Sequence, residues 1–542
     1  MAGNPGLKIR LSQQGLDGIG NSIFNTLWDY LETNSLPGPI HVAQPPFSLK
    51  LFDARISGIG GEREEVLRLM PNRGGLVIGV DDVAFRYSIP SIHSSLRGRG
   101  LMGRAGNVFP GLVEAEVEGL RIAALLQPTR HRNQAMQVAE CQAAVKNTRL
   151  NLKPDRAVVA AYLDGYKELI DDAFERRLPQ AFCSYFTSLL ESAVNQIFSK
   201  AVVEMEFNEL ETNLNDQIGA TAAKIWSGLM INNTMTRMIV GPEYLETHHL
   251  GQMQYRGSTR QTPFFPRRVM DRPDGDSMLF ITLTDYTLQS MFYHMATERK
   301  LKIIIERGDL TGEFRSLLQT SCREENEENL LNPKVAATSS TTSDPLQEFQ
   351  GTCLGSILPE IRRDYPNRVM RIVLMPWGIP SFVIANGAAV LGFRGRLFYQ
   401  VTRFPTSVFR DTSRIKERDW LTILAGEVKA VAEIPFRFQG NRLYGDIRFT
   451  KAEFSIKKRR ALENMDPDVI ESTAPVLEDL LSDYLKGKLA EGLDMSSKVL
   501  PLSFYNIRLL NSDDFILIGT DFRIDEAALK DQLRSALQSS RF

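Results

Sequence analysis

The chain has 542 residues, with 64 lysines and arginines against 65 aspartates and glutamates, and a formal net charge of −1. This balance excludes a protein-wide basic field of the kind that attracts nucleic acid, so recognition of an anion depends on local patches. One hydrophobic core rarely serves so long a chain, whereas two domains of about 250 residues are ordinary. No apolar run approaches the roughly 20 residues that cross a bilayer as a helix.

The first residues predict a strand followed by an amphipathic helix, and the same order returns in the second half. Leu7, Ile9 and Leu11 alternate, as Leu279 and Ile281 do later. Apolar residues then recur at helical spacing in both halves: Leu16, Ile19, Ile23, Leu27 and Leu31 in the first, and Leu288, Met291, Phe292 and Met295 in the second. We interpret this as a duplication that produces two pseudo-equivalent domains.

The segment from Phe85 to Asn107 is basic and contains no acidic residue. It includes a literal GxGxxG, Gly98–Gly103, but the residues after it cannot open a helix, so a dinucleotide site is disfavoured. Basic and apolar side chains on a flexible hairpin tip suit a membrane surface, where each Lys or Arg near anionic lipid contributes about 1 kcal/mol. A solvated loop with incidental arginines is the alternative. The tip residues are Arg97, Arg99, Leu101, Met102 and Arg104.

The four cysteines form two pairs that each stay within one half: Cys141 with Cys183, and Cys322 with Cys353. Neither pair has the short spacing of a zinc or redox motif. Pairing within each half is the simplest of three possibilities, and disulfides would persist only in an oxidising compartment. The cysteines therefore favour a secreted protein, and a glycosylation sequon at Asn232 is compatible with secretion. Four buried free thiols are the alternative.

Further elements follow from periodicity and composition. The Pro/Gly/Arg-rich stretch 241–276 predicts an interdomain linker, which gives an N-terminal domain over 1–240 and a C-terminal domain over 277–524. Residues 323–350 are acidic and then Ser/Thr-rich, which is typical of a surface loop; the sequence does not identify a partner for it.

The chain ends in a predicted amphipathic helix within 525–542. Each half also has a later helix, with apolar residues at Val159, Tyr162, Leu163, Tyr166, Leu169 and Ile170 in one and at Val476, Leu477, Leu480, Leu481, Tyr484 and Leu485 in the other.

Motifs of catalysis are missing from the sequence. It contains no HExxH, no GxSxG and no Walker A pattern. The six histidines include no pair at metal-ligand spacing beyond the adjacent His248 and His249. We therefore expect a protein that is not an enzyme and has neither a metal site nor a cofactor.

Several stretches together resemble the family of bactericidal/permeability-increasing protein and lipopolysaccharide-binding protein, which also contains phospholipid and cholesteryl ester transfer proteins. The segment from Cys141 to Val194 resembles the family's disulfide-bracketed strand, tip and long helix. Four other stretches match in order along the chain: GLKIRLSQQGLDGI, MLFITLTDYTLQSMFYHM, GSILPEIRRDYPN and LPLSFYNIRLLNSDDFILIGTDF. The resemblance therefore spans nearly the whole chain.

The resemblance implies an α+β fold of two tubular barrels, each a highly twisted antiparallel sheet wrapped around a long helix, joined by a central sheet into an elongated boomerang. Each barrel would hold the acyl chains of a phospholipid in an apolar tunnel, and Cys141 with Cys183 would match the family disulfide. By position, Lys153 and Arg156 would join the arginines of the tip. Candidate tunnel residues are Leu16, Ile19, Ile23, Val159, Leu163 and Tyr166, for each of which ordinary core packing is the alternative.

The expected function is therefore lipid binding and phospholipid transfer by a secreted protein. It would dock reversibly on anionic membranes or lipoprotein surfaces through the N-terminal tip. Burying a methylene is worth about 0.8 kcal/mol, so a sixteen-carbon chain resists entry into water by about 12 kcal/mol, and an apolar tunnel removes most of that barrier. The alternative function is recognition of bacterial lipopolysaccharide in innate immunity, through the same loops and without net transfer.

Overall fold

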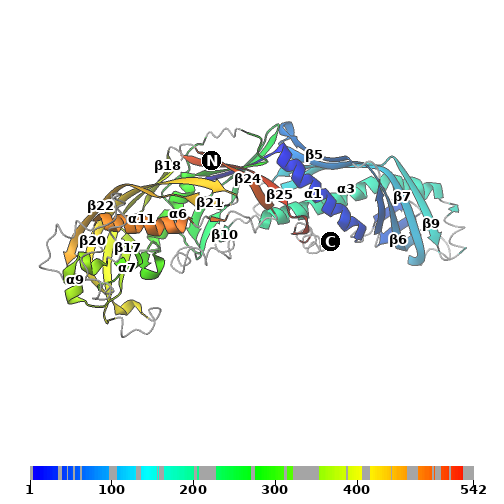
Figure 1. Cartoon of the computed structure of the whole chain (residues 1–542). Coiled ribbons are helices and arrows are strands. Elements are labelled where there is room, and N and C mark those ends of the chain that lie inside the picture. Colours follow the sequence, from blue (N-terminus) through cyan, green and yellow to red (C-terminus); the bar gives the residue numbers. More distant parts are fainter. Residues whose placement is uncertain are drawn as a thin grey trace, which may run out of the picture.

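A computed structural model shows an elongated, gently curved molecule, with the first 200 residues at one end and most of the second half at the other (Figure 1). No helix in the described part of the chain is long and apolar enough to span a membrane. The structure describes residues 4–33, 40–44, 47–52, 55–60, 64–96, 106–129, 136–154, 157, 164–165, 167–200, 204–206, 227–269, 275–310, 314–321, 353–385, 388–405, 415–440, 442–459, 474–490, 493–494, 502–511, 514–528 and 531.

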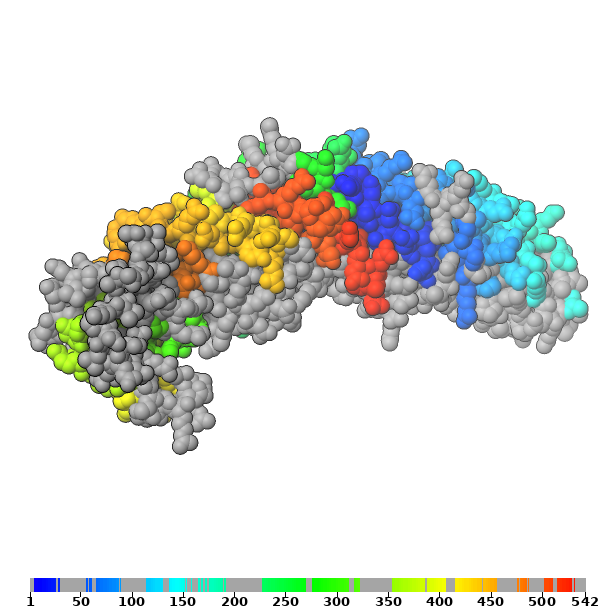
Figure 2. Space-filling model, viewed as in Figure 1, coloured from blue at the N-terminus to red at the C-terminus, as the bar shows by residue number. Residues whose placement is uncertain are grey.

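A six-stranded antiparallel sheet joins the two halves at the centre of the molecule. Its strand order is β12-β13-β1-β15-β25-β24, so the repeated strands β1 and β15 are neighbours, with Ile9 opposite Ile281. Strand β25 also contacts helix α1 of the first half, and Figure 2 shows the last strands beside the first residues in the middle of the molecule. The strands are β1 (Leu7–Ser12), β12 (Met235–Val240), β13 (Tyr244–His249), β15 (Leu279–Thr284), β24 (Leu502–Asn511) and β25 (Phe515–Ile524).

The hydrogen bonds at the two ends of the β1–β15 pair repeat each other. Ser12 donates from its main-chain N–H and its Oγ to the carbonyl oxygen of Met278, at 3.0 and 3.2 Å. Thr284 donates in the same way to the carbonyl oxygen of Gly6, at 3.0 and 2.8 Å. The repeated strand and helix of the sequence thus occupy equivalent positions about the middle of this pair.

A polar cluster lies on the central sheet and is almost buried. Glu246 of β13, whose side chain is 5% exposed, accepts a hydrogen bond from Nε of Arg10 at 2.7 Å and lies 2.6 Å from Nε2 of His248. These polar contacts and the nearby Lys8 hold the pKa of Glu246 down to about 2, against the opposing effect of its burial, which is the largest single influence. The Arg10 guanidinium also lies over the ring of Tyr244. The cluster therefore holds a carboxylate in its charged form at the junction of the two halves.

The N-terminal half is an eight-stranded antiparallel sheet with two long helices. Its strand order is β2-β3-β6-β7-β8, with β4 and β5 paired to β6 and β9 paired to β7. The helices are α1 (Gln13–Thr33) and α3 (Lys167–Lys200), and a short 3₁₀ turn, η1 (Pro71–Arg73), precedes β6. The strands are β2 (Ile40–Gln44), β3 (Phe47–Phe52), β4 (Arg55–Gly60), β5 (Glu64–Met70), β6 (Gly75–Leu96), β7 (Gly106–Pro128), β8 (Met136–Ala144) and β9 (Asn147–Pro154).

The C-terminal half has a second eight-stranded antiparallel sheet and a small three-stranded one. The large sheet has the order β16-β17-β19-β20-β21-β23, with β18 on β19 and β22 on β20, and the small one has the order β10-β11-β14. Its helices are α6 (Asp285–Thr297), α7 (Phe314–Leu317), α8 (Leu354–Ile357), α9 (Pro359–Asp364) and α11 (Ala474–Ala490), with 3₁₀ turns η2 (Arg307–Asp309) and η6 (Glu417–Asp419). The strands are β10 (Glu204–Glu206), β11 (Leu229–Asn232), β14 (Gln252–Tyr255), β16 (Ile303–Glu306), β17 (Met370–Pro376), β18 (Ser381–Ala385), β19 (Ala388–Thr402), β20 (Trp420–Gln439), β21 (Arg442–Gly445), β22 (Arg448–Arg459) and β23 (Leu493–Asp494).

This architecture confirms the predicted fold class. Antiparallel sheets with long helices form the two halves, and a central sheet connects them. The predicted linker over 241–276 differs in part, because β13 and β14 lie within it. The polar residues of β13 hide the strand in the sequence, since the partner of Glu246 is Arg10, 236 residues away. The proposed domain bounds themselves stay a prediction.

The predicted loop and C-terminal helix can be followed only in part. Residues 323–350 lie outside the described residues. At the start of the tail the backbone is helical at 526–528, and Asp525 Oδ1 accepts hydrogen bonds from the N–H groups of Ala527 and Ala528, both at 3.1 Å. This is the arrangement of a helix N-cap. Except for Asp531, the rest of the tail lies outside the described residues.

Candidate lipid-binding site

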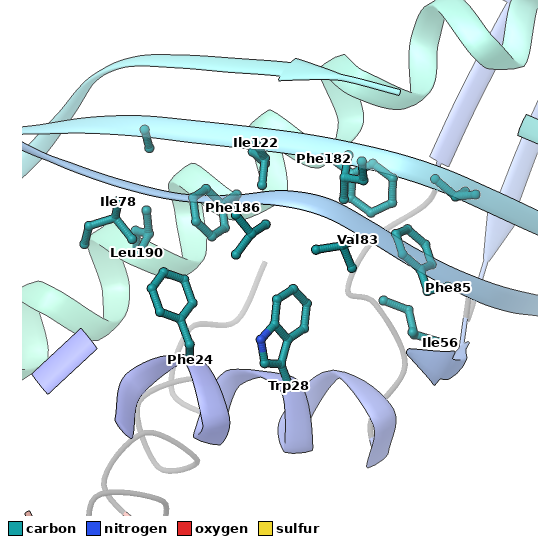
Figure 3. Close-up of a cluster of buried hydrophobic side chains, with 14 of the residues drawn as sticks. Phe24, Trp28, Ile56, Ile78, Val83, Phe85, Ile122, Phe182, Phe186 and Leu190 are labelled. Carbon is teal, nitrogen blue, oxygen red and sulfur yellow. The ribbon is translucent and has the colours of Figure 1, made fainter. Parts of the chain in front are cut away.

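The interior of the N-terminal half is built from one row of apolar side chains on α3. Leu178, Phe182, Phe186 and Leu190 recur every four residues, which places them on one face of the helix, and all four are buried. They pack against strands β6 and β7, and the rings of Phe182 and Phe85 meet edge to face with centroids 5.4 Å apart. Figure 3 shows Phe186 and Leu190 approaching the side chains of α1 across this interior.

Helix α1 closes the same interior with a second row of side chains. Leu16, Phe24 and Trp28 are buried in the core, and Trp28 donates a hydrogen bond from Nε1 to Oε1 of Glu65 at 3.0 Å. Ile19 and Ile23 belong to the neighbouring row of the helix and are only half-buried. Of the candidate tunnel residues on α1, Leu16 therefore has the surroundings of an ordinary core residue. Ile19 and Ile23 keep apolar surface that an acyl chain could cover.

A disulfide and a hydrogen bond attach α3 to the sheet beside these rings. Cys141 of β8 is bonded to Cys183 of α3, which confirms the first predicted pair. Oε1 of Glu191 accepts a hydrogen bond from the N–H of Val138 at 2.9 Å. Cys353 is buried and also disulfide-bonded, while Cys322 lies outside the described residues. The free-thiol alternative is therefore wrong for the three cysteines that the structure describes.

The register of the strands brings the predicted tip segments to one end of the N-terminal sheet. Ser95 pairs with Gly106 where β6 ends and β7 begins, and β9 runs toward the same end of the sheet until Pro154 pairs with Gly111. Gly106 and Gly111 are five residues apart along β7, so the end of β9 lies about 17 Å along the sheet from the end of β6. The residues predicted to bind headgroups, apart from Lys153, lie outside the described residues: Arg97, Arg99, Leu101, Met102, Arg104 and Arg156.

Two described basic residues on the strands that lead toward this end have carboxylate partners. Nζ of Lys153 lies 2.7 Å from Oε2 of Glu114, and Nε of Arg86 lies 2.8 Å from Oε1 of Glu116. The sequence did not reveal these partners, because they come from the neighbouring strand rather than from the segment itself. Exposed pairs of this kind are weak and are screened by salt, so both basic groups remain able to exchange partners.

Of the remaining predicted sites, the glycosylation sequon is described and the tunnel residues beyond α1 are not. Asn232 lies at the end of β11, where its Oδ1 accepts a hydrogen bond from the N–H of Thr234 at 3.0 Å, and it is half-buried. Val159, Leu163 and Tyr166 lie outside the described residues. Among the residues that the structure describes, no cluster of three or more potential metal ligands occurs.

The C-terminal half has a comparable apolar interior. Leu480 and Leu481 of α11 are buried in one apolar cluster with residues of β17, β19 and β20, and Val476 and Tyr484 pack against this cluster. Burial raises the pKa of Tyr484 to about 12, so its hydroxyl is neutral over the whole physiological range. Helix α6 contributes to two smaller clusters through residues that include Phe292, whose ring stacks on Phe382 with centroids 5.8 Å apart.

Sequence reasoning missed the aromatic row of α3, although the signal was present. The helix residues predicted from periodicity stop at Ile170, although the resemblance implied a long helix in the segment that ends at Val194; the helix continues to Lys200. A proline at position 179 interrupts the expected helical pattern. The spacing of Leu178, Phe182 and Phe186 carries the missed signal, because apolar residues four apart recur on one helix face.

Comparisons with known proteins add a family match and three structural similarities. The profile described as "LBP / BPI / CETP family, C-terminal domain" matches residues 227–524. The crystal structure of lipopolysaccharide binding protein is similar at 13% identity and a TM-score of 0.45, covering 96% of this chain and 99% of that one. P47 of Clostridium botulinum E1 has 8% identity and a TM-score of 0.23 over 96% and 99% of the two chains. Takeout 1 of Epiphyas postvittana has 8% identity and a TM-score of 0.23 over 32% and 84%.

A search among curated proteins found no match. The family match covers more than half of the chain and includes the central strands β12 to β15, most of the described C-terminal half and the last strand β25. Membership supports lipid binding in general as the activity. The chain belongs to the LBP/BPI/CETP family.

Proposed function

We propose that this protein binds phospholipid through its acyl chains and transfers it between membranes or lipoprotein surfaces as a secreted carrier. The observation that carries the proposal is the apolar interior between α1, α3 and the N-terminal sheet, together with the half-buried apolar row that Ile19 and Ile23 form on the same helix α1. Moving an acyl chain from a bilayer to a site lined by such side chains costs little free energy, because both surroundings are apolar. The protein would act without forming or breaking a covalent bond.

Docking on anionic membranes through the N-terminal tip completes the proposal. The strand ends that lead into the basic tip segments lie at one end of the sheet, which favours a joint basic surface formed by Arg97, Arg99 and Arg104. Each basic residue near anionic lipid contributes about 1 kcal/mol, so such contact is reversible. Glycosylation at Asn232 and a partner for residues 323–350 remain proposals of the sequence alone.

A transfer assay tests acyl-chain binding. Fluorescent phospholipid in self-quenched donor vesicles gains emission as the protein carries it to unlabelled acceptor vesicles. Ile23→Glu puts a charge on the half-buried row of α1, and transfer should slow by about tenfold or more because a carboxylate beside hydrocarbon is strongly unfavourable. Asn25→Glu adds the same charge on the exposed face of the same helix and should leave the rate unchanged. Equal rates for the two variants would contradict the proposed site.

The tip is tested separately by vesicle flotation with Arg97, Arg99 and Arg104 all changed to Glu. Binding to anionic vesicles at low salt should weaken by about tenfold or more. Binding that persists would refute the tip assignment. A protein that transfers no phospholipid but binds lipopolysaccharide through the tip would instead favour recognition of lipopolysaccharide without transfer.

A further inference from the structure

A second surface of the molecule, in the C-terminal half, concentrates exposed apolar side chains. Seven large hydrophobic side chains are exposed in the described part of the chain, and four of them come from nine consecutive residues that include the end of β17, the connection and the start of β18. These four are Met375, Trp377, Ile379 and Val383, and Trp377 is 54% exposed. Scattered single residues of this kind need no explanation, but four in one short segment do. We call the segment 375–383 the β17–β18 ribbon.

The ribbon is apolar on both of its faces. Its exposed apolar residues have odd numbers, and the even-numbered Phe382 and, just beyond the ribbon, Ile384 are buried in a core cluster with Ala389 and Ile516. An antiparallel sheet with one face in water normally alternates apolar inward with polar outward. The outer face of the ribbon departs from that pattern, which indicates that another apolar phase covers it.

Two arginines accompany the exposed tryptophan. The guanidinium carbons of Arg394 and Arg396, both on β19, lie 5.8 and 5.6 Å from the centroid of the Trp377 ring. Both arginines are exposed, and neither forms an ion pair among the described residues. Their strand partners on β20 are Lys429 and Glu427, and Lys429 is itself paired to Glu453. The positive charge of Arg394 is therefore available to an anionic partner, and Arg396 lies opposite Glu427 without an ion pair to it among the described residues.

We propose that the β17–β18 ribbon, with Arg394 and Arg396, is a second docking surface for anionic lipid. Tryptophan favours the boundary between hydrocarbon and water, and arginine extends its charge to headgroup phosphates while its aliphatic stem stays among apolar groups. Methionine, isoleucine and valine supply surface that enters the acyl region. The arginines distinguish this occupant from a neutral apolar partner, since a neutral surface would leave two positive charges without compensation.

The ribbon shares no residue with the N-terminal tip. Strand β18, in which the ribbon ends, contacts the central region of the molecule, because the N–H of Asp514 donates to the carbonyl oxygen of Ile384 at 2.9 Å and β18 packs on α6. In Figure 1, β18 is labelled at the upper edge of the C-terminal half, whereas β6, β7 and β9 lie at the far end of the other half. The inference therefore goes beyond the proposed function and is independent of whether phospholipid occupies the interior.

Tryptophan fluorescence with brominated lipid tests this surface directly. Vesicles of phosphatidylcholine with phosphatidylglycerol brominated on its acyl chains quench only indoles that reach the bilayer. Wild-type protein should lose emission on these vesicles, and Trp377→Phe should abolish most of that loss. Vesicles of phosphatidylcholine alone, brominated on its acyl chains so that they carry the quencher without the negative charge, should quench little. The substitution is at an exposed position, so folding should be retained.

A charge-reversal pair supplies the matched control. The double variant Arg394→Glu/Arg396→Glu should weaken binding to the anionic vesicles by about tenfold or more, because two favourable charges become unfavourable. Arg437→Glu/Arg523→Glu reverses two exposed arginines that lie over other rings, Tyr444 and Tyr505, and should change binding less than about twofold.

Three results would overturn the inference. Quenching that is the same in wild type and Trp377→Phe would show that another tryptophan enters the bilayer. Equal weakening by the two charge-reversal variants would show a general charge effect. Sedimentation velocity that reveals a wild-type dimer dissolved by Trp377→Phe would assign the ribbon to a second copy of the chain. If the ribbon proposal is wrong, the comparison of transfer rates between Ile23→Glu and Asn25→Glu is not affected. The two proposals can therefore be refuted separately.

Discussion

Replacing Glu246 by Gln tests whether the polar cluster at the centre stabilises the junction of the two halves. The glutamine keeps the shape of the side chain and removes the charge that Arg10 and His248 contact. A pKa lowered from 4.5 to about 2 corresponds to about 3 kcal/mol of folding free energy at neutral pH. Because the carboxyl group is nearly buried, screening by solvent reduces this value little. We expect Glu246→Gln to lose about 3 kcal/mol at pH 7.

The stabilisation by Glu246 depends on pH in a direction that follows from its lowered pKa. The pKa is lower in the folded than in the unfolded protein, so the stabilisation is complete above about pH 4.5 and disappears as the pH falls toward 2. Urea denaturation of wild type and Glu246→Gln, followed by tryptophan fluorescence at pH 7 and pH 3, measures the difference. The gap between the two proteins should narrow at pH 3. Glu453→Gln removes an exposed, paired carboxylate and should leave the midpoint unchanged. A gap that is small at pH 7, or equal at both pH values, would refute the reasoning.

Three further predictions concern the candidate site and its supports. Phe186→Ala should lower the free energy of unfolding by about 3 to 5 kcal/mol in urea titrations because it opens a cavity in the row of α3, and a loss below 1 kcal/mol would place the ring outside the core. Replacing both Cys141 and Cys183 by Ala should cost about 4 kcal/mol by the same measurement, and an unchanged midpoint would mean that the bond does not constrain the chain. Gly15→Ala should lower the melting temperature in calorimetry, since its Cβ would lie 2.5 Å from a main-chain carbonyl oxygen of the second half, whereas Gly60→Ala meets nothing within 4 Å and should not; equal melting temperatures would contradict the close approach.

The sequence predicted the fold because its strongest signals are local and repeated. Leu7, Ile9 and Leu11 have the period of a strand, and the second half repeats them, so the strand and the helix that follows could be placed twice. What periodicity could not provide is that β1 and β15 pair with each other, since that contact joins residues more than 260 positions apart. Pairing at this distance depends on tertiary contacts such as those of Ser12 and Thr284 rather than on local propensity.

The sequence predicted an apolar lipid-binding interior, but it identified only some of the residues that form it. Ile19 and Ile23 share the helical spacing of Leu16, and only the packing of α1 separates the half-buried row from the core. The ion pair of Lys153 with Glu114 was hidden because the partner lies on a neighbouring strand. The β17–β18 ribbon was hidden for another reason: a continuous apolar segment in a sequence does not reveal which of its faces another layer covers.

The central claim is tested most directly by native mass spectrometry of the purified chain, followed by lipid identification after organic extraction. The account predicts stoichiometric phospholipid bound to the wild-type protein, reduced in Ile23→Glu and retained in Asn25→Glu. A chain that is free of lipid, or that carries equal phospholipid in both variants, would contradict it.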